Sequence, residues 1–432
     1  RLPPAGAIVF AGYFPAYDET AAAAGRFRSR YAAPLQDALA ARGRAEAWLL
    51  TFVPLEGRSW LDALGALRKF IRAGERLFLV EEFFGLHEAA SALILWLSLS
   101  VEAEAVWRDL DRTALFSEPV PPEAEPILSA LWARSFFGAP LMEGIIATLS
   151  YRRSFADLPR PSACVYWSEM HGWEKALSRA ARAAGVKTIG FQHGSILGSF
   201  FNYFPDPSET AESAPDSLPL PDVYAADGDI PRQMLARSAY PGLCRAEAVR
   251  YLGLRAGLDA PPTPLPSDPA LLIAGSIDAA ETRVLALLAT RAFPDGKVRL
   301  LFKGHPGQPF APGLDSLGLS GRPGGEVVEG TLSGAIARAS AVLAGSSGAG
   351  LEALAAGRET IVPRRSDALP LSPLSDFPEF RRDAGSPEEL RREFSECAAG
   401  KRRFSVEDGR GFLRRYWDLD AALPGWRGLL GL

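Results

Sequence analysis

Short apolar runs alternate with stretches of helical periodicity over most of the chain. Between two early runs, the stretch from Trp60 to Arg72 places its large apolar side chains on one helical stripe. Alternating strands and helices predict parallel, doubly wound sheets, and therefore an α/β fold. Strands are expected at 7–13, 47–53, 76–81, 163–167, 188–191, 222–226, 270–274, 298–302, 326–329, 341–344 and 360–363. The main helices are expected at 31–42, 60–72, 173–184, 232–238, 281–292, 333–339, 349–356 and 387–399.

A proline-rich segment divides this series into two halves. Residues 260–269 read APPTPLPSDP, with five prolines in ten positions, which is typical of a linker. We therefore expect a first domain at 1–255 and a second domain at 270–400. The segment at about 87–150 has a mostly helical pattern that is interrupted near 119–126. It is expected to be a helical insertion that packs on the first sheet.

The longest apolar stretch lies inside this insertion. Ala89 to Val101 reads AASALILWLSLSV, which is too short to span a bilayer. The pattern favours a buried core helix over a membrane-surface anchor. The first residues also lack the basic region, long apolar run and cleavage site of a secretory signal. The expected location is the cytoplasm.

Length, charge and cysteine content restrict the class of function. A chain of 432 residues is too long for one ordinary core, which agrees with two domains. A formal net charge of −4 gives no basic surface for nucleic acid. The cysteines at 164, 244 and 397 are far apart and form no CxxC motif, so neither a zinc site nor a disulfide framework is expected.

Polar residues follow three predicted strands of the second half. Carboxyl ends of parallel strands are where open α/β sheets place ligands. A Gly/Ser turn that opens a helix presents N–H groups and hydroxyls that suit a phosphate. Two ordinary strand-to-helix turns would give the same pattern, but their succession favours a nucleotide phosphate site. The candidate residues are Lys303, His305 and Pro306 after one strand, Gly345, Ser346, Ser347, Gly348 and Glu352 after another, and Gly275 and Ser276 after the third.

Two strands of the first half end in groups capable of proton transfer. One strand, at 163–167, precedes Glu169 and His171, and the next ends in Gln192, His193, Gly194 and Ser195. Neighbouring parallel strands bring these tips to one edge. Imidazoles and a carboxylate there provide a general base. Alternatively, Glu169 caps a helix and His193 is a loop histidine with satisfied hydrogen bonds.

An Asp-x-Asp motif at Asp227 and Asp229 allows two interpretations. Paired carboxylates could hold a divalent cation. A helix is predicted directly after the motif, so Asp229 is more naturally its N-cap. No metal site is predicted.

Several of these motifs resemble those of a known enzyme family. The Lys-x-His-Pro strand end, the Ser-Ser turn and the Glu-bearing helix are similar to GT-B glycosyltransferases, above all to bacterial sialyl-, polysialyl- and Kdo-type transferases and CDP-glycerol transferases of surface polysaccharides. The strand end Ile189 to Gly194, reading IGFQHG, resembles the same superfamily. The resemblance covers about 200 residues, from Ala163 to Pro363. It implies two Rossmann-like domains facing across a cleft, with residues 405–432 crossing back to the first domain as a helix.

The resemblance also implies a reaction. His305, Ser346 and Ser347 would contact the donor phosphate with support from Lys303 and Glu352, and His193 or Glu169 would be the base. The implied donor is a CMP-activated 2-keto sugar such as Kdo or a sialic-acid-like sugar, and the acceptor is a glycan or lipid-linked glycan. Such enzymes generally need no metal or other cofactor. Peripheral attachment to the inner membrane would suit a lipid-linked acceptor.

Three other functions are compatible with these motifs. A CDP-alditol phosphotransferase would use the same His and Ser-Ser residues, and a nucleotide-sugar 2-epimerase would share the two-domain fold. A non-catalytic scaffold would bind the nucleotide without turnover.

Overall fold

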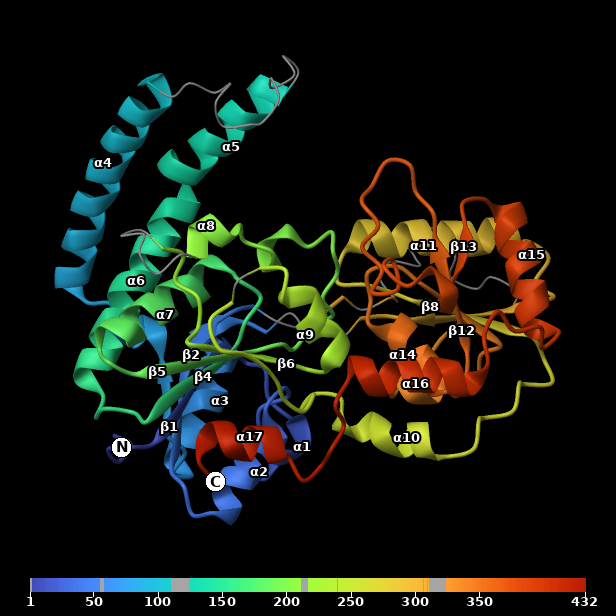
Figure 1. Cartoon of the computed structure of the whole chain (residues 1–432), viewed down its shortest axis with the longest axis horizontal. Helices are drawn as coiled ribbons and strands as arrows, with labels where there is room; N and C mark the ends of the chain where they lie inside the picture. The colour runs from blue at the N-terminus through green and yellow to red at the C-terminus, as the bar shows by residue number, and fades with distance from the viewer. Residues whose placement is uncertain are drawn as a thin grey trace.

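Two parallel β-sheets organise the chain, one in each half (Figure 1). The computed structural model describes residues 2–54, 58–109, 124–210, 217–238, 240–305, 307–308, 310 and 324–432. Within these ranges the first sheet has the order β3-β2-β1-β4-β5-β6-β7 and the second β10-β9-β8-β11-β12-β13. Every strand pair is parallel. The predicted α/β class is confirmed.

The strands of the first sheet are β1 (Ile8–Phe14), β2 (Glu46–Phe52), β3 (Leu77–Leu79), β4 (Ala163–Trp167), β5 (Lys187–Phe191), β6 (Val223–Ala226) and β7 (Leu243–Arg245). Those of the second are β8 (Ala270–Ala274), β9 (Arg299–Lys303), β10 (Gly325–Val327), β11 (Ala341–Ala344), β12 (Glu359–Pro363) and β13 (Arg382–Ala384). The three-residue edge strands β7 and β13 were not predicted, because neither carries an apolar run.

Helices cover both faces of each sheet. In the first half they are α1 (Glu19–Ala23), α2 (Ala33–Ala41), α3 (Trp60–Arg72), α4 (Leu86–Asp109), α5 (Glu125–Phe137), α6 (Ala139–Asp157), α7 (Gly172–Ala183), α8 (Pro207–Thr210), α9 (Asp229–Leu235) and α10 (Arg255–Asp259). In the second half they are α11 (Ala279–Ala292), α13 (Leu332–Ala337), α14 (Ala349–Ala355), α15 (Pro387–Ala398), α16 (Val406–Tyr416) and α17 (Pro424–Leu430).

Local capping explains where several helices begin. Ser59 and Asp62 form a capping box at the start of α3, each side chain accepting from the other residue's backbone N–H. Thr331 caps α13 by accepting from the amide of Gly334 at 3.2 Å. The N-cap of α9 is Gly228, so the expectation that Asp229 caps this helix is wrong. Asp229 is the first helical residue and instead pairs with Arg245 at 3.1 Å.

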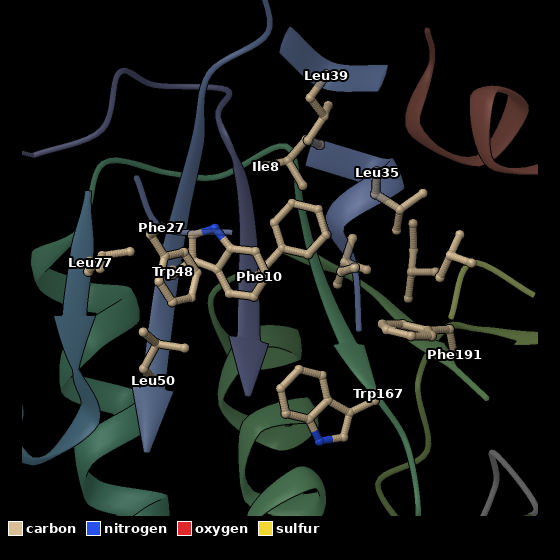
Figure 2. Close-up of a cluster of buried hydrophobic side chains, with 14 of the residues drawn as sticks. Ile8, Phe10, Phe27, Leu35, Leu39, Trp48, Leu50, Leu77, Trp167 and Phe191 are labelled. Carbon is tan, nitrogen blue, oxygen red and sulfur yellow. The ribbon is translucent and has the colours of Figure 1, made fainter. Parts of the chain in front are cut away.

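The core of the first domain is rich in aromatic rings (Figure 2). Phe10 of β1 stacks on Trp48 of β2 with ring centroids 4.7 Å apart, and Phe27 meets Trp48 edge-on at 5.0 Å. Helices α2, α3 and α17 pack on this face of the sheet, and α6 and α7 cover the other face. Burial on both faces explains why these strands are apolar runs without alternation.

The last helix packs on the first sheet although it follows the second domain in sequence (Figure 1). Trp426 is 1 % exposed, and its indole N–H donates to the carbonyl of Glu247 at 2.9 Å. The Glu247 carboxylate accepts from the amides of Gly425 and Trp426 at 2.9 and 3.1 Å. Preceding it, α16 contacts both α14 and α9. The C-terminal segment therefore ties the two halves together.

One prediction about the insertion is wrong. Ala89 to Val101 was expected to be a buried core helix, but it belongs to the 24-residue helix α4, in whose most apolar window of 18 residues only 11 % is buried. This helix packs along one side only, against α5 and α6. By length and composition it could cross a membrane.

The C-terminal return yields a stability prediction. Trp426→Ala should lower the free energy of unfolding by about 3–5 kcal/mol, because it leaves a cavity in the core and removes the bond to Glu247. Urea unfolding followed by circular dichroism measures this loss. Arg427→Ala, one residue further on the exposed side of α17, is the control and should change stability by less than about 0.5 kcal/mol. Equal effects of the two substitutions would show that α17 does not dock as described.

Candidate functional site

Both sheets reverse their strand order at a central pair. In the first sheet the reversal lies between β1 and β4, and in the second between β8 and β11. Ligands of open α/β sheets bind beyond the carboxyl ends of strands at such points. A cavity of about 970 Å³ lies there, with walls from both halves. Its lining includes Glu169, Gly194, Ser195 and Arg250 from the first half, and Gly275, Ser276, Lys303, His305, Ser346, Ser347, Gly348 and Glu352 from the second.

The end of β9 provides a cation and an imidazole to this cavity. Lys303 is the last residue of β9 and is half-buried. It forms no ion pair with any residue that the structure describes. His305 accepts a hydrogen bond at Nδ1 from the amide of Gly307 at 3.0 Å, which fixes the direction of the ring. Pro306 lies outside the described residues.

The Ser-Ser turn is held by an acid that the sequence did not single out. Glu281 of α11 accepts from both the amide and the hydroxyl of Ser346. A Cβ on Gly345 would lie 2.1 Å from the Glu281 carboxylate, so a larger residue there would displace this side chain from the turn. Ser347 Oγ accepts from the amide of Ala349 at 3.3 Å and keeps its own hydrogen available. The two serines therefore differ, because the hydroxyl hydrogen of Ser346 is already used.

Gly275 and Ser276 shape the cavity wall. Gly275 donates its amide to the Lys303 carbonyl at 2.9 Å. The Ser276 hydroxyl is 2 % exposed and exchanges hydrogen bonds with the backbone of Asp278. Ser276 therefore closes a turn and has little capacity left for a ligand.

Three titratable groups of the first half form a chain beside the cavity. Glu169 Oε2 lies 3.3 Å from His171 Nε2, and Glu169 Oε1 lies 3.5 Å from His193 Nδ1. His193 is enclosed by the rings of Tyr31 and Trp167, at 5.2 and 5.9 Å between centroids. Glu169 borders the cavity, whereas His171 and His193 do not. The carboxylate is thus the member of this chain that a cavity ligand can reach.

Burial shifts the pKa values of these groups in different directions. It lowers the pKa of His193 to about 4, so this imidazole is neutral at pH 7. It raises the pKa of Glu174, whose carboxylate accepts from the amides of Glu169 and His171, to about 8. Burial also acts to raise the pKa of Glu169, but the adjacent histidines and Arg250 outweigh it and lower the pKa below its usual range. Glu169 therefore carries the negative charge beside a neutral Glu174.

Gln192 and Asp227 support the loop rather than line the cavity. The Gln192 amide donates to the Gly194 carbonyl at 2.8 Å and its oxygen accepts from the amide of Asp227 at 3.0 Å. Burial raises the pKa of Asp227 well above its usual value, which makes it a poor metal ligand. Within the described ranges, no three His, Cys, Asp or Glu side chains gather as a metal site.

Arg250 is a functional candidate that the sequence did not indicate. It lines the cavity, donates to the His193 carbonyl at 3.0 Å, and lies over the rings of Tyr31 and Tyr251 at 5.1 and 5.4 Å. It forms no ion pair in the described part of the chain. Arg250 follows β7, and because that strand carries no apolar run, no strand end marked this position.

The architecture is the GT-B fold, in which two Rossmann-like domains face one another across a cleft. The solved structure of CalG4, the calicheamicin glycosyltransferase, matches 98 % of this chain and 96 % of its own with a TM-score of 0.50 and 15 % sequence identity. S. aureus MnaA in a co-structure with UDP matches 96 % of this chain and 94 % of its own, also with a TM-score of 0.50, at 11 % identity. No family model and no curated protein sequence matches the chain.

The buried imidazole yields a pH prediction. The folded pKa of His193, about 4, lies below its ordinary value of 6.5. Between these values the unfolded chain binds a proton that the folded chain does not, so acid destabilises the fold. His193→Phe should remove about 2 kcal/mol of the stability that is lost between pH 7 and pH 5.

Urea unfolding of the wild type and the variant at both pH values measures this difference. The same substitution at His87, on the exposed first turn of α4, is the control and should leave the pH dependence unchanged. An unaltered pH dependence in His193→Phe would mean that His193 titrates normally in the fold.

Proposed function

We propose that this protein is a glycosyltransferase that moves a sugar from a nucleotide donor to an acceptor hydroxyl. The observation that carries the proposal is the cavity between the sheets, where Arg250 and Lys303, two cations without ion-pair partners among the described residues, occur together with the carboxylate of Glu169. The GT-B fold and its similarity to the two solved structures support the same class. In this proposal residues 1–255 contact the acceptor, 270–400 the donor, and 405–432 join the two.

The cations would stabilise the negative charge that develops on a departing nucleotide. Breaking the bond between the sugar and the phosphate leaves the electron pair, and therefore negative charge, on a phosphate oxygen. Arg250 uses one of its five N–H donors on His193 and keeps the others for such an anion. Lys303, His305 and the Ser347 hydroxyl approach from the second domain. Preorganised donors of this kind stabilise developing charge without a metal.

Glu169 is the proposed base. The acceptor oxygen attacks the anomeric carbon, the bond from that carbon to the phosphate oxygen breaks, and the acceptor proton passes to the Glu169 carboxylate. His171 hydrogen-bonds this carboxylate at 3.3 Å and acts as a positioning residue, while His193 Nδ1 lies 3.5 Å from it without a hydrogen-bond partner among the described residues. A bound donor phosphate would raise the pKa of Glu169, because two anions then share the cavity, and would make it a stronger base.

The donor proposed first is a CMP-activated 2-keto sugar, since the residues around Lys303, His305, Ser346 and Ser347 resemble those of sialyl- and Kdo-type transferases. The proposed acceptor is a glycan or lipid-linked glycan. Thermal unfolding in the presence of CMP, CDP, UDP or GDP identifies the nucleotide, because a ligand that binds only the folded state stabilises it. If none of the four nucleotides raises the unfolding temperature, the proposal is wrong.

The cations yield a binding prediction. Arg250→Ala and Lys303→Ala should each weaken binding of the identified nucleotide at least about tenfold, because a charge-assisted bond to phosphate is lost. Isothermal titration calorimetry measures both affinities. Arg237→Ala, an exposed cation of the same domain outside the cavity lining, is the matched control and should bind normally. If all three variants bind equally well, the nucleotide lies elsewhere.

The base yields a prediction for turnover. With the corresponding nucleotide sugar, Glu169→Gln should lower kcat by about 10²–10⁴ while nucleotide affinity changes little. His305→Ala should lower kcat by about 10²–10³ if it contacts the leaving phosphate. Product analysis separates the alternatives, because an epimerase would convert the sugar of UDP-GlcNAc without any acceptor, and a phosphotransferase would move alditol phosphate from CDP-glycerol to an acceptor and release CMP. Normal turnover in Glu169→Gln would exclude it as the base.

A further inference from the structure

Exposed large hydrophobic side chains of the described residues are concentrated on α4 and α5, which project from the first domain (Figure 1). Of the nineteen large hydrophobic side chains exposed in the described part of the chain, eight lie on α4 and three on α5. The two helices form one unit, since Trp107 stacks on Trp132 at 5.0 Å and Ser100 Oγ donates to the Phe136 carbonyl at 2.9 Å. Monomeric soluble proteins rarely expose large contiguous apolar patches.

The outward side of α4 is as apolar as its packed side. Its packed side carries Ala92, Ser100 and Ala103, which are buried against its neighbours. On the opposite side, Ile94, Leu97 and Val101 are 67 %, 51 % and 71 % exposed. They recur at i, i+3 and i+7, so they form one stripe. No charged residue occurs between His87-Glu88 and Glu102. A helix that is apolar all round is normally enclosed by protein core or by lipid.

Cations gather where this surface meets the body of the protein. A groove of about 720 Å³ between α4, α5, α6 and α7 is lined by apolar side chains that include Leu95, Leu99 and Phe136. Arg152 of α6 and Lys175 and Arg179 of α7 also line it, the last two being one helical turn apart. None of these three cations has an ion-pair partner among the described residues. Apolar surface beside unpaired cations complements the acyl chains and phosphates of anionic lipid.

We infer that α4 and α5 dock this protein on the surface of an anionic bilayer. The outward stripe of α4 enters the acyl boundary, and Arg152, Lys175 and Arg179 contact lipid phosphates. Glu102, Glu104 and Asp109 near the end of α4 remain in the aqueous layer, so α4 lies along the surface rather than across it. A second copy of the chain would cover the apolar stripe but would repel the three cations.

Docking at this place has a consequence that rests on the proposed function. Gly172 lines the groove and Glu169 lines the cavity, and three residues span at most about 11 Å. An acceptor carried on a lipid would therefore present its hydroxyl close to Glu169. The cavity would work at the membrane surface without the acceptor leaving the bilayer.

Vesicle flotation of the full chain tests the docking. Wild-type protein should float with vesicles of equal parts phosphatidylcholine and phosphatidylglycerol, and much less with phosphatidylcholine alone. Ile94→Glu and Val101→Glu should each weaken binding about tenfold or more, because each places a charge where an apolar side chain enters lipid. Leu61→Glu, at a 77 % exposed position of α3, is the matched control and should bind as the wild type does.

The cations are tested separately with Arg152→Gln, Lys175→Gln and Arg179→Gln. Each should weaken binding to the mixed vesicles about fivefold and reduce its dependence on salt. Failure of the wild type to float, or equal flotation of Ile94→Glu, would overturn the inference. So would a wild-type dimer in sedimentation velocity that Ile94→Glu dissociates, since a second copy would then be the occupant. Nucleotide affinity of the same variants should be unchanged, so the docking and the proposed reaction can fail independently.

Discussion

The parallel direction of all strand pairs in both sheets is the constraint on which the site depends. Because every strand of a sheet ends at the same edge, the polar residues after β4, β5, β8, β9 and β11 meet in one region although they are far apart in sequence. The two edges face one cavity, and α16 and α17 connect the halves by returning to the first sheet. Within that frame, Arg250 and Lys303 face the same space without an ion-pair partner among the described residues. A bound anion would be attracted by both cations.

Sequence patterns predicted most of the strands and helices but not all residues of the site. Strands buried on both faces, such as β4, β8 and β11, are uninterrupted apolar runs, and their predicted bounds agree with the structure. The edge strand β13 was missed because it begins with Arg382, which reads as a surface residue. Arg382 is nevertheless 6 % exposed, since Glu359, Glu393 and Glu396 surround its guanidinium. Such neutralisation is a tertiary property that a linear pattern does not contain.

The site residues that the sequence did not indicate were missed for the same reason. Arg250 was not recognised because β7, the strand before it, is short and lacks an apolar run. Glu281 was only the first residue of a predicted helix, yet its side chain fixes the Ser346 turn, 65 residues away in sequence. The helix α4 was misread for the opposite reason, because its composition is that of a core helix while its position leaves one side uncovered. Composition indicates that a helix prefers an apolar environment, but only the fold shows whether other parts of the protein supply that environment.

The acid–base balance beside the cavity follows from how each carboxyl is surrounded. Glu174 and Glu169 are five residues apart, and two like charges so close together would be costly if both were ionised. Burial keeps Glu174 protonated, with its pKa near 8, while His171 and Arg250 keep Glu169 charged. His193, neutral in its aromatic enclosure, lies 3.5 Å from Glu169 and adds no positive charge beside it at pH 7. In the proposed reaction an anionic donor would occupy Arg250, remove part of the field that lowers the pKa of Glu169, and so raise the basicity of that carboxylate only when there is a bond to break.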